Sequence, residues 1–164
     1  MLSRTKIPLK KNITRSINYL VSQLEYGKNM KENIYSIYDD KEIELFDTKK
    51  KQITILGYGP QGRSQALNLK DNGFNVNIGL RKGNSWEKAL NDGWKENENL
   101  LSIEEASEKG DIIQYLLSDA GQISNWNNVK PFLTENKTLY FSHGFGIVYK
   151  DQTNIVPPAN INVI

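Results

Sequence analysis

Residues 52–62 constrain the fold of this chain more than any other stretch. They read Gln-Ile-Thr-Ile-Leu-Gly-Tyr-Gly-Pro-Gln-Gly, so that an apolar, β-branched run ends at Gly57 and three glycines follow at the spacing Gly-x-Gly-x-x-Gly. After Gly62 the apolar residues recur at helical spacing, with Ala66, Leu67 and Leu69 on one face. A strand, a glycine turn and a helix in this order are the context in which the motif indicates a dinucleotide site.

Each glycine of the motif has a distinct physical reason. Gly57 allows the tight turn, Gly59 lets the backbone approach a pyrophosphate, and Gly62 lets helix and strand pack closely. The free N–H groups and the positive dipole end of the following helix then face the phosphates. The alternative is an ordinary βα turn that happens to be rich in glycine.

The composition limits the classes of partner. A chain of 164 residues with 38% apolar and 24% charged residues is typical of one globular domain with its own core. The net charge of +2 favours neither a nucleic acid nor a membrane surface as partner, and no apolar run approaches the ~20 residues of a membrane span. The chain has no cysteine, which excludes disulfides and thiolate metal sites.

The first residues differ from the rest. Five basic residues precede the first acidic one, Glu25. We interpret residues 1–34 as a polar N-terminal arm and residues 35–164 as the nucleotide-binding domain. We expect the protein to be cytoplasmic. The alternative is that the arm is an organelle transit peptide, which would place the protein in a mitochondrion or plastid.

Strands and helices alternate from Gln52 onward. We predict a strand at 75–79, a helix capped by Ser85, a helix with the capping-box spacing Ser102 to Glu105 that ends at Gly110, a buried strand at 112–117, a weak helix at 125–133 and a strand at 138–142. The tryptophans are expected to pack in the core. The repeated βα order predicts an α/β fold with a doubly wound parallel sheet of the Rossmann type.

The end of the second strand indicates which dinucleotide is bound. An Asp or Glu there would accept hydrogen bonds from the ribose 2′-hydroxyl of NAD, but this chain has Arg81, followed by Lys82 and Ser85. A carboxylate repels a 2′-phosphate, whereas a guanidinium binds one through two parallel hydrogen bonds. The sequence therefore favours NADP(H). The alternative is a solvated pair of surface cations.

Two further stretches follow predicted strands. His143 is the only histidine and lies between a core strand and a glycine, where a ligand of an open α/β sheet binds. It is a candidate catalytic residue, although a lone histidine can equally be structural. Residues 117–122 also follow a strand and are expected near the nicotinamide half, but a simple helix N-cap at Ser118 or Asp119 explains them as well.

Six segments then occur in an order that resembles the ketol-acid reductoisomerase (acetohydroxyacid isomeroreductase) family over about residues 35–164. They are residues 57–62, 65–73, 79–86, 113–122, 140–146 and 156–159. The resemblance implies that His143 is the active-site histidine. It also implies that NADP(H) contacts the glycine motif, the second strand's end and the turn after residue 118, which together comprise Gly57, Tyr58, Gly59, Pro60, Gln61, Gly62, Arg81, Ser85, Asp119, Ala120, Gly121 and Gln122.

The sequence departs from the family in two places. Pro60 stands where many members have Ser, which removes one backbone donor but is tolerated at a helix start. The turn between Arg81 and Trp86 is shorter than in many relatives, so that Ser85 need not reach the 2′-phosphate as theirs does.

The resemblance implies a Mg²⁺-dependent alkyl migration in 2-acetolactate or 2-aceto-2-hydroxybutyrate, then hydride transfer from NADPH, in branched-chain amino acid biosynthesis. Enzymes of the family continue into an all-helical domain whose Asp and Glu side chains bind two Mg²⁺ ions. We therefore expect this chain to be a Rossmann domain truncated before the helical domain. We expect it to lack the metal ligands and to be inactive alone. Its expected partner is the missing helical domain or another copy of the chain. The alternatives are a non-catalytic NADP-binding fragment and a different Rossmann dehydrogenase acting on 2-oxo acids.

Overall fold

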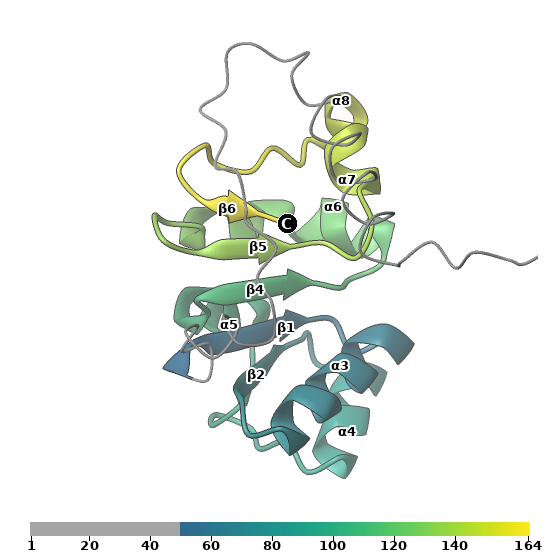
Figure 1. The fold of residues 1–164 in the computed structure, drawn as a ribbon. Coiled ribbons are helices and arrows are strands. Elements are labelled where there is room, and N and C mark those ends of the chain that lie inside the picture. Colours follow the sequence, from purple (N-terminus) through teal and green to yellow (C-terminus); the bar gives the residue numbers. More distant parts are fainter. Residues whose placement is uncertain (1–49) are drawn as a thin grey trace, which may run out of the picture. The chain divides into compact units, whose positions relative to one another are not determined.

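Six parallel strands form one sheet in residues 50–164, which are the residues that the computed structural model describes. The predicted arm of residues 1–34 lies outside them. The spatial order is β3-β2-β1-β4-β5-β6, and every strand is parallel to its neighbours; Figure 1 labels all of them except β3. The strands are β1 (Gln52–Leu56), β2 (Asn75–Gly79), β3 (Leu100–Leu101), β4 (Ile112–Tyr115), β5 (Thr138–Tyr140) and β6 (Asn162–Val163). The predicted doubly wound parallel sheet is confirmed.

Helices cover both faces of this sheet. The longer ones are α3 (Pro60–Asp71), α4 (Asn84–Asn91), α5 (Ile103–Lys109) and α6 (Asp119–Val129), and the short ones are η2 (Lys130–Phe132), α7 (Phe145–Val148) and α8 (Lys150–Thr153). Figure 1 shows α3 and α4 in front of the sheet and α5 and α6 behind it. Because the order reverses between β1 and β4, the helices after these two strands lie on opposite faces and leave a crevice at the carboxyl ends.

Each face has its own apolar core. In front of the sheet, Ile55 of β1 and its neighbour Ile78 of β2 pack with Ala66 and Trp86 from the helices. Leu56, the next residue along β1, points to the opposite face. Behind the sheet, the second cluster contains Leu56, Leu101, Ile103, Ala106, Ile113, Tyr115, Trp126, Val129, Leu133, Leu139, Phe141 and Ile155. Trp86, Trp94 and Trp126 are at most 4% exposed, which confirms their predicted packing role.

The predicted strand at 112–117 is correct in position but too long. β4 ends at Tyr115, and Leu116 and Leu117 continue into the loop before α6. β4 is covered on both faces, but unequally: Ile113 and Tyr115 are fully buried in the cluster behind the sheet, whereas Ile112, which packs against the cluster in front, and Gln114 are partly exposed.

Helix starts show where local signals succeed. The Ser102 capping box is confirmed, with the Ser102 hydroxyl accepting from the Glu105 N–H at 3.2 Å, and Gly110 ends α5. α3 begins at Pro60, before Gly62, since a proline at the first helical position loses no intrahelical hydrogen bond. The prediction for Ser85 is wrong: Gly83, at a φ of 144°, is the N-cap of α4, and Ser85 lies in its first turn.

The helix expected at 125–133 begins earlier. α6 starts at Asp119, because the Ser118 hydroxyl caps it by accepting from the Gly121 N–H at 3.3 Å. Pro131 lies just beyond it, in η2. The sequence did not indicate β3, which has two residues.

Candidate dinucleotide-binding site

The glycine turn joins β1 to α3 through close backbone contacts. Gly57 has a φ of 107°, and a Cβ there would lie 2.6 Å from the Leu116 carbonyl oxygen. A Cβ on Gly62 would collide with the carbonyl oxygen of Gly57. Both positions therefore require glycine because backbone from a neighbouring segment occupies the space of a side chain.

Gly59 is different, since nothing lies within 4 Å of a Cβ built there, and its φ of −70° is accessible to any residue. The space beside it is open to the first turn of α3. A glycine that the fold itself does not require fits a close approach of the backbone to a ligand.

The turn forms one wall of a pocket of about 540 Å³ at the carboxyl ends of β1, β2 and β4. The pocket is lined by Gly57, Tyr58, Gly59, Leu80, Arg81, Lys82, Gly83, Asn84, Ser85, Ile103, Leu116, Leu117 and Ser118. Of the predicted cofactor residues, the structure thus brings together Gly57, Tyr58, Gly59, Arg81 and Ser85. The remaining predicted positions in α3 and α6 do not line it.

Tyr58 contributes backbone rather than its ring to this wall. The side chain is 3% exposed, its hydroxyl donates to the Asp92 carboxylate at 2.8 Å, and it accepts from the indole N–H of Trp94 at 2.7 Å. Burial, together with the hydrogen bond to Asp92, raises the pKa of Tyr58 to about 12. The phenol is therefore neutral, and it anchors the glycine turn to the segment after α4.

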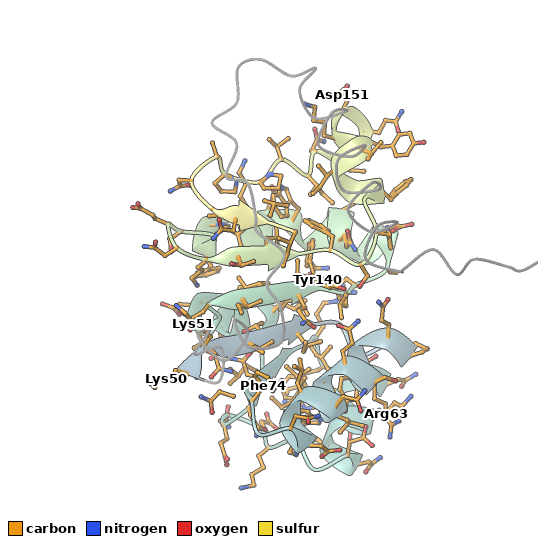
Figure 2. The ribbon with its side chains drawn as sticks, viewed as in Figure 1. Lys50, Lys51, Arg63, Phe74, Tyr140 and Asp151 are labelled. Carbon is orange, nitrogen blue, oxygen red and sulfur yellow. The ribbon has the colours of Figure 1, made fainter. Side chains whose placement is uncertain are left out.

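Asp92 also binds Arg63, which lies on α3 and is labelled in Figure 2. The guanidinium Nε and Nη2 donate to the two carboxylate oxygens at 2.6 and 2.7 Å, the fork geometry of strong pairs. Hydrogen bonds from Arg63 and then Tyr58 lower the pKa of Asp92 to about 2. The carboxylate thus links the first half of α3 to the end of α4.

The loop between β2 and α4 carries the two cations that the sequence indicated. Arg81 is exposed, lines the pocket and makes no ion pair with any residue from 50 to 164. Lys82 behaves differently: its ammonium pairs with Glu96 and lies 3.7 Å from the ring centroid of Trp86. Only one of the two cations is therefore unpaired within the described part of the chain.

The first turn of α6 divides into exposed and buried residues. Asp119 and Ala120 are exposed, whereas Gln122 is 2% exposed. The Gln122 side-chain amide donates to the carbonyl oxygens of Tyr115 at 3.2 Å and Leu117 at 3.0 Å, and the Tyr115 hydroxyl donates to the Gln122 carbonyl at 2.6 Å. Gln122 therefore fastens α6 to the end of β4, and its side chain does not face the pocket.

His143 lies at the carboxyl end of β5, as predicted. Its Nε2 is 3.4 Å from a carboxylate oxygen of Asp119, and both side chains are about half exposed. The neighbouring Ser142 accepts a hydrogen bond from the Gln61 side-chain amide at 2.7 Å. This contact joins the first turn of α3 to the loop after β5, so that Gln61, Asp119 and His143 belong to the crevice where the strand order reverses.

Sequence reasoning missed several of these residues. Asn84 lines the pocket without belonging to the glycine motif. Asp92 and Glu96 follow α4 in a polar stretch that resembles any solvated surface. Leu117 and Ser118, by contrast, line the pocket within the stretch 117–122 that the sequence singled out.

Within residues 50–164, no three His, Asp or Glu side chains gather in an arrangement that would hold a metal ion. None of the helices in the same range has both the length and the apolar character needed to cross a membrane.

Comparison with known proteins agrees with this geometry. Residues 47–164 match the family model described as acetohydroxy acid isomeroreductase, NADPH-binding domain. A ketol-acid reductoisomerase (NAD(+)) of Desulfosudis oleivorans is 61% identical over 71% of the chain and 33% of its own length. The mitochondrial ketol-acid reductoisomerase of Saccharomyces cerevisiae is 45% identical over 88% of the chain and 37% of its own length.

A solved structure shares both fold and sequence. The NADH-preferring ketol-acid reductoisomerase from an uncultured archaeon superposes with a TM-score of 0.65 and 42% identity, over 79% of this chain and 39% of that one. The chain thus covers 33% to 39% of the length of these relatives.

Proposed function

Because this chain belongs to the acetohydroxy acid isomeroreductase, or ketol-acid reductoisomerase, family, we propose that its pocket binds NADP(H) for that family's reaction. The whole activity is the alkyl migration in 2-acetolactate or 2-aceto-2-hydroxybutyrate followed by reduction. Bound NADPH would supply the hydride. The observation that carries the proposal is the 540 Å³ pocket at the strand-order reversal, with the glycine turn at one wall and Arg81 at another.

The residues present fit such a cofactor. The open space beside Gly59 suits a pyrophosphate, which the free N–H groups and dipole of α3 would stabilise. No acidic residue occupies the first turn of α3 to oppose it. The exposed guanidinium of Arg81 suits a 2′-phosphate, because it can donate two parallel hydrogen bonds.

The choice between NADPH and NADH is the finer part of this proposal. Two of the relatives named above bear the words NAD(+) and NADH-preferring, whereas the family model is named for NADPH. We assign NADP(H) to this chain because Arg81 occupies the position at which a carboxylate would select NAD.

We further propose that His143 faces the substrate and that Asp119 orients its imidazole. The carboxylate of Asp119, 3.4 Å from Nε2, would favour the tautomer that carries its proton on Nε2, which would leave Nδ1 to exchange a proton with a substrate oxygen. The other cofactor residues beyond the pocket lining, Pro60, Gln61, Gly62 and 120–122, act in this proposal through the position of their backbone. Mg²⁺ belongs to the family reaction, but within residues 50–164 no three His, Asp or Glu side chains form a cluster that would hold it.

The proposal is tested by titrating the purified protein with NADPH and with NADH. We expect NADPH to bind more tightly, and Arg81→Asp to reverse the preference, because the change removes a cation and adds repulsion to the 2′-phosphate. Equal dissociation constants in the unmutated chain would refute the cofactor assignment. Failure to bind either dinucleotide would refute the function of the pocket.

A further inference from the structure

The ammonium of Lys82 is held in place by two groups outside its own loop. Lys82 Nζ pairs with the carboxylate of Glu96, and it stands 3.7 Å from the ring centroid of Trp86. Glu96 precedes β3, and its backbone is bridged to Leu100, which is fully buried. Trp86 is 4% exposed, so that its ring is fixed by the core. Lys82 therefore has a defined resting position although its side chain is 63% exposed.

This position competes with ligand binding. Lys82 lines the pocket next to Arg81, where a second cation would strengthen the attraction of a phosphate. A carboxylate next to that ammonium offsets its charge, and an aromatic face adds a further attraction that a phosphate would have to replace. Lys82 must leave Glu96, at least in part, before it can contact a phosphate.

We infer that Glu96 is a specificity-determining residue of the dinucleotide pocket, which weakens the preference for a 2′-phosphate by holding Lys82. The inference rests on the proposed function of the pocket, since it concerns the discrimination of NADPH from NADH at that site. Glu96 acts through Lys82 and does not contact the cofactor, and its effect is confined to ligands that carry the additional phosphate.

A neighbouring ion pair supplies a matched control. Lys95 and Glu98 are joined at 3.2 Å, with side chains 70% and 61% exposed, and neither residue lines the pocket. Glu98→Gln therefore removes the same charge two residues from Glu96 without releasing Lys82. General electrostatic effects of a lost negative charge are thereby separated from the effect of this one pair.

The experiment measures dissociation constants of NADPH and NADH for the unmutated chain, Glu96→Gln and Glu98→Gln. We expect Glu96→Gln to tighten NADPH about two- to fivefold, the range of exposed ion pairs, and to leave NADH unchanged. The gain should shrink at high salt, because solvent-exposed charges are screened. Glu98→Gln should leave the ratio of the two constants unchanged. In a chain that also carries Lys82→Ala, Glu96→Gln should no longer change the ratio of the NADPH and NADH dissociation constants.

Three results would overturn the inference: an unchanged or weakened preference for NADPH in Glu96→Gln, an equal shift in Glu98→Gln, or a shift that persists without Lys82. Any of them, found in a chain that binds the dinucleotides, leaves the proposed function intact. Failure of the unmutated chain to bind either dinucleotide would overturn the proposed function and this inference together.

Discussion

Replacing Gly59 or Gly62 by alanine should separate the binding of the dinucleotide from the stability of the fold. The two glycines belong to one motif and are three residues apart, yet their surroundings differ. A Cβ at Gly59 meets nothing within 4 Å, whereas a Cβ at Gly62 would collide with the carbonyl oxygen of Gly57 and lie 3.1 Å from its carbon. The same chemical change therefore probes two different roles.

For Gly62→Ala the cost falls on the fold. Overpacking typically costs about 1–3 kcal/mol, and the upper part of that range applies because the opposing atoms are backbone of a tight turn rather than a flexible side chain. Alanine recovers up to ~1 kcal/mol in a helix relative to glycine. The net loss of about 2 kcal/mol corresponds to a Tm lower by about 4–8 °C, at about 2–4 °C per kcal/mol.

For Gly59→Ala the cost falls on the ligand. Its φ of −70° and ψ of −175° suit alanine, and the lower entropy of the unfolded chain offsets the poorer capping by alanine at this N-cap of α3, so the Tm should change little. The added methyl group would occupy the space through which a pyrophosphate approaches the backbone. A steric conflict of about 1–3 kcal/mol weakens binding roughly 5- to 150-fold.

The assays are thermal unfolding followed by circular dichroism and calorimetric titration with NADPH, each applied to both variants. Full NADPH affinity in Gly59→Ala would show that no phosphate approaches this turn, and the reasoning would be wrong. An unchanged Tm in Gly62→Ala would contradict the close packing of α3 on β1.

Two other changes probe the groups around the pocket. The pKa of Asp92 is lowered from 3.8 to about 2, so its contribution to stability is present above about pH 4 and is lost as the pH falls toward 2. Asp92→Asn should therefore lower the Tm at neutral pH, with a difference from the parent that shrinks between about pH 4 and pH 2; a constant difference would exclude the charge of Asp92 as the cause. In the active enzyme, His143→Ala should reduce kcat by at least about 100-fold while NADPH affinity stays nearly the same. Normal turnover combined with a lower Tm would instead assign His143 a structural role.

The sequence alone determined those features of this protein that depend on contiguous residues. The glycine turn, β2 and the capping box of α5 are each specified within a few residues, because turn geometry and helix capping are local interactions. The parallel sheet also followed from the βα alternation, since right-handed crossovers leave few topologies open. The positions of Arg81 and His143 at strand ends were predictable for the same reason.

Tertiary structure alone decided which side chains meet. The Tyr58–Asp92 hydrogen bond joins residues 34 positions apart, and the Gln61–Ser142 bond spans 81 positions. Residues so far apart become neighbours only when the sheet order brings their loops to one edge. The same holds for Lys82 and Glu96, and for Gln122, whose turn toward the core depends on the carbonyl groups at the end of β4. β3 depends on tertiary structure most of all. Its two residues are too few to show a hydrophobic periodicity, and their strand conformation comes from pairing with β2, whose Ile78 N–H, like that of Leu80 just after it, donates to carbonyl groups beside and within β3.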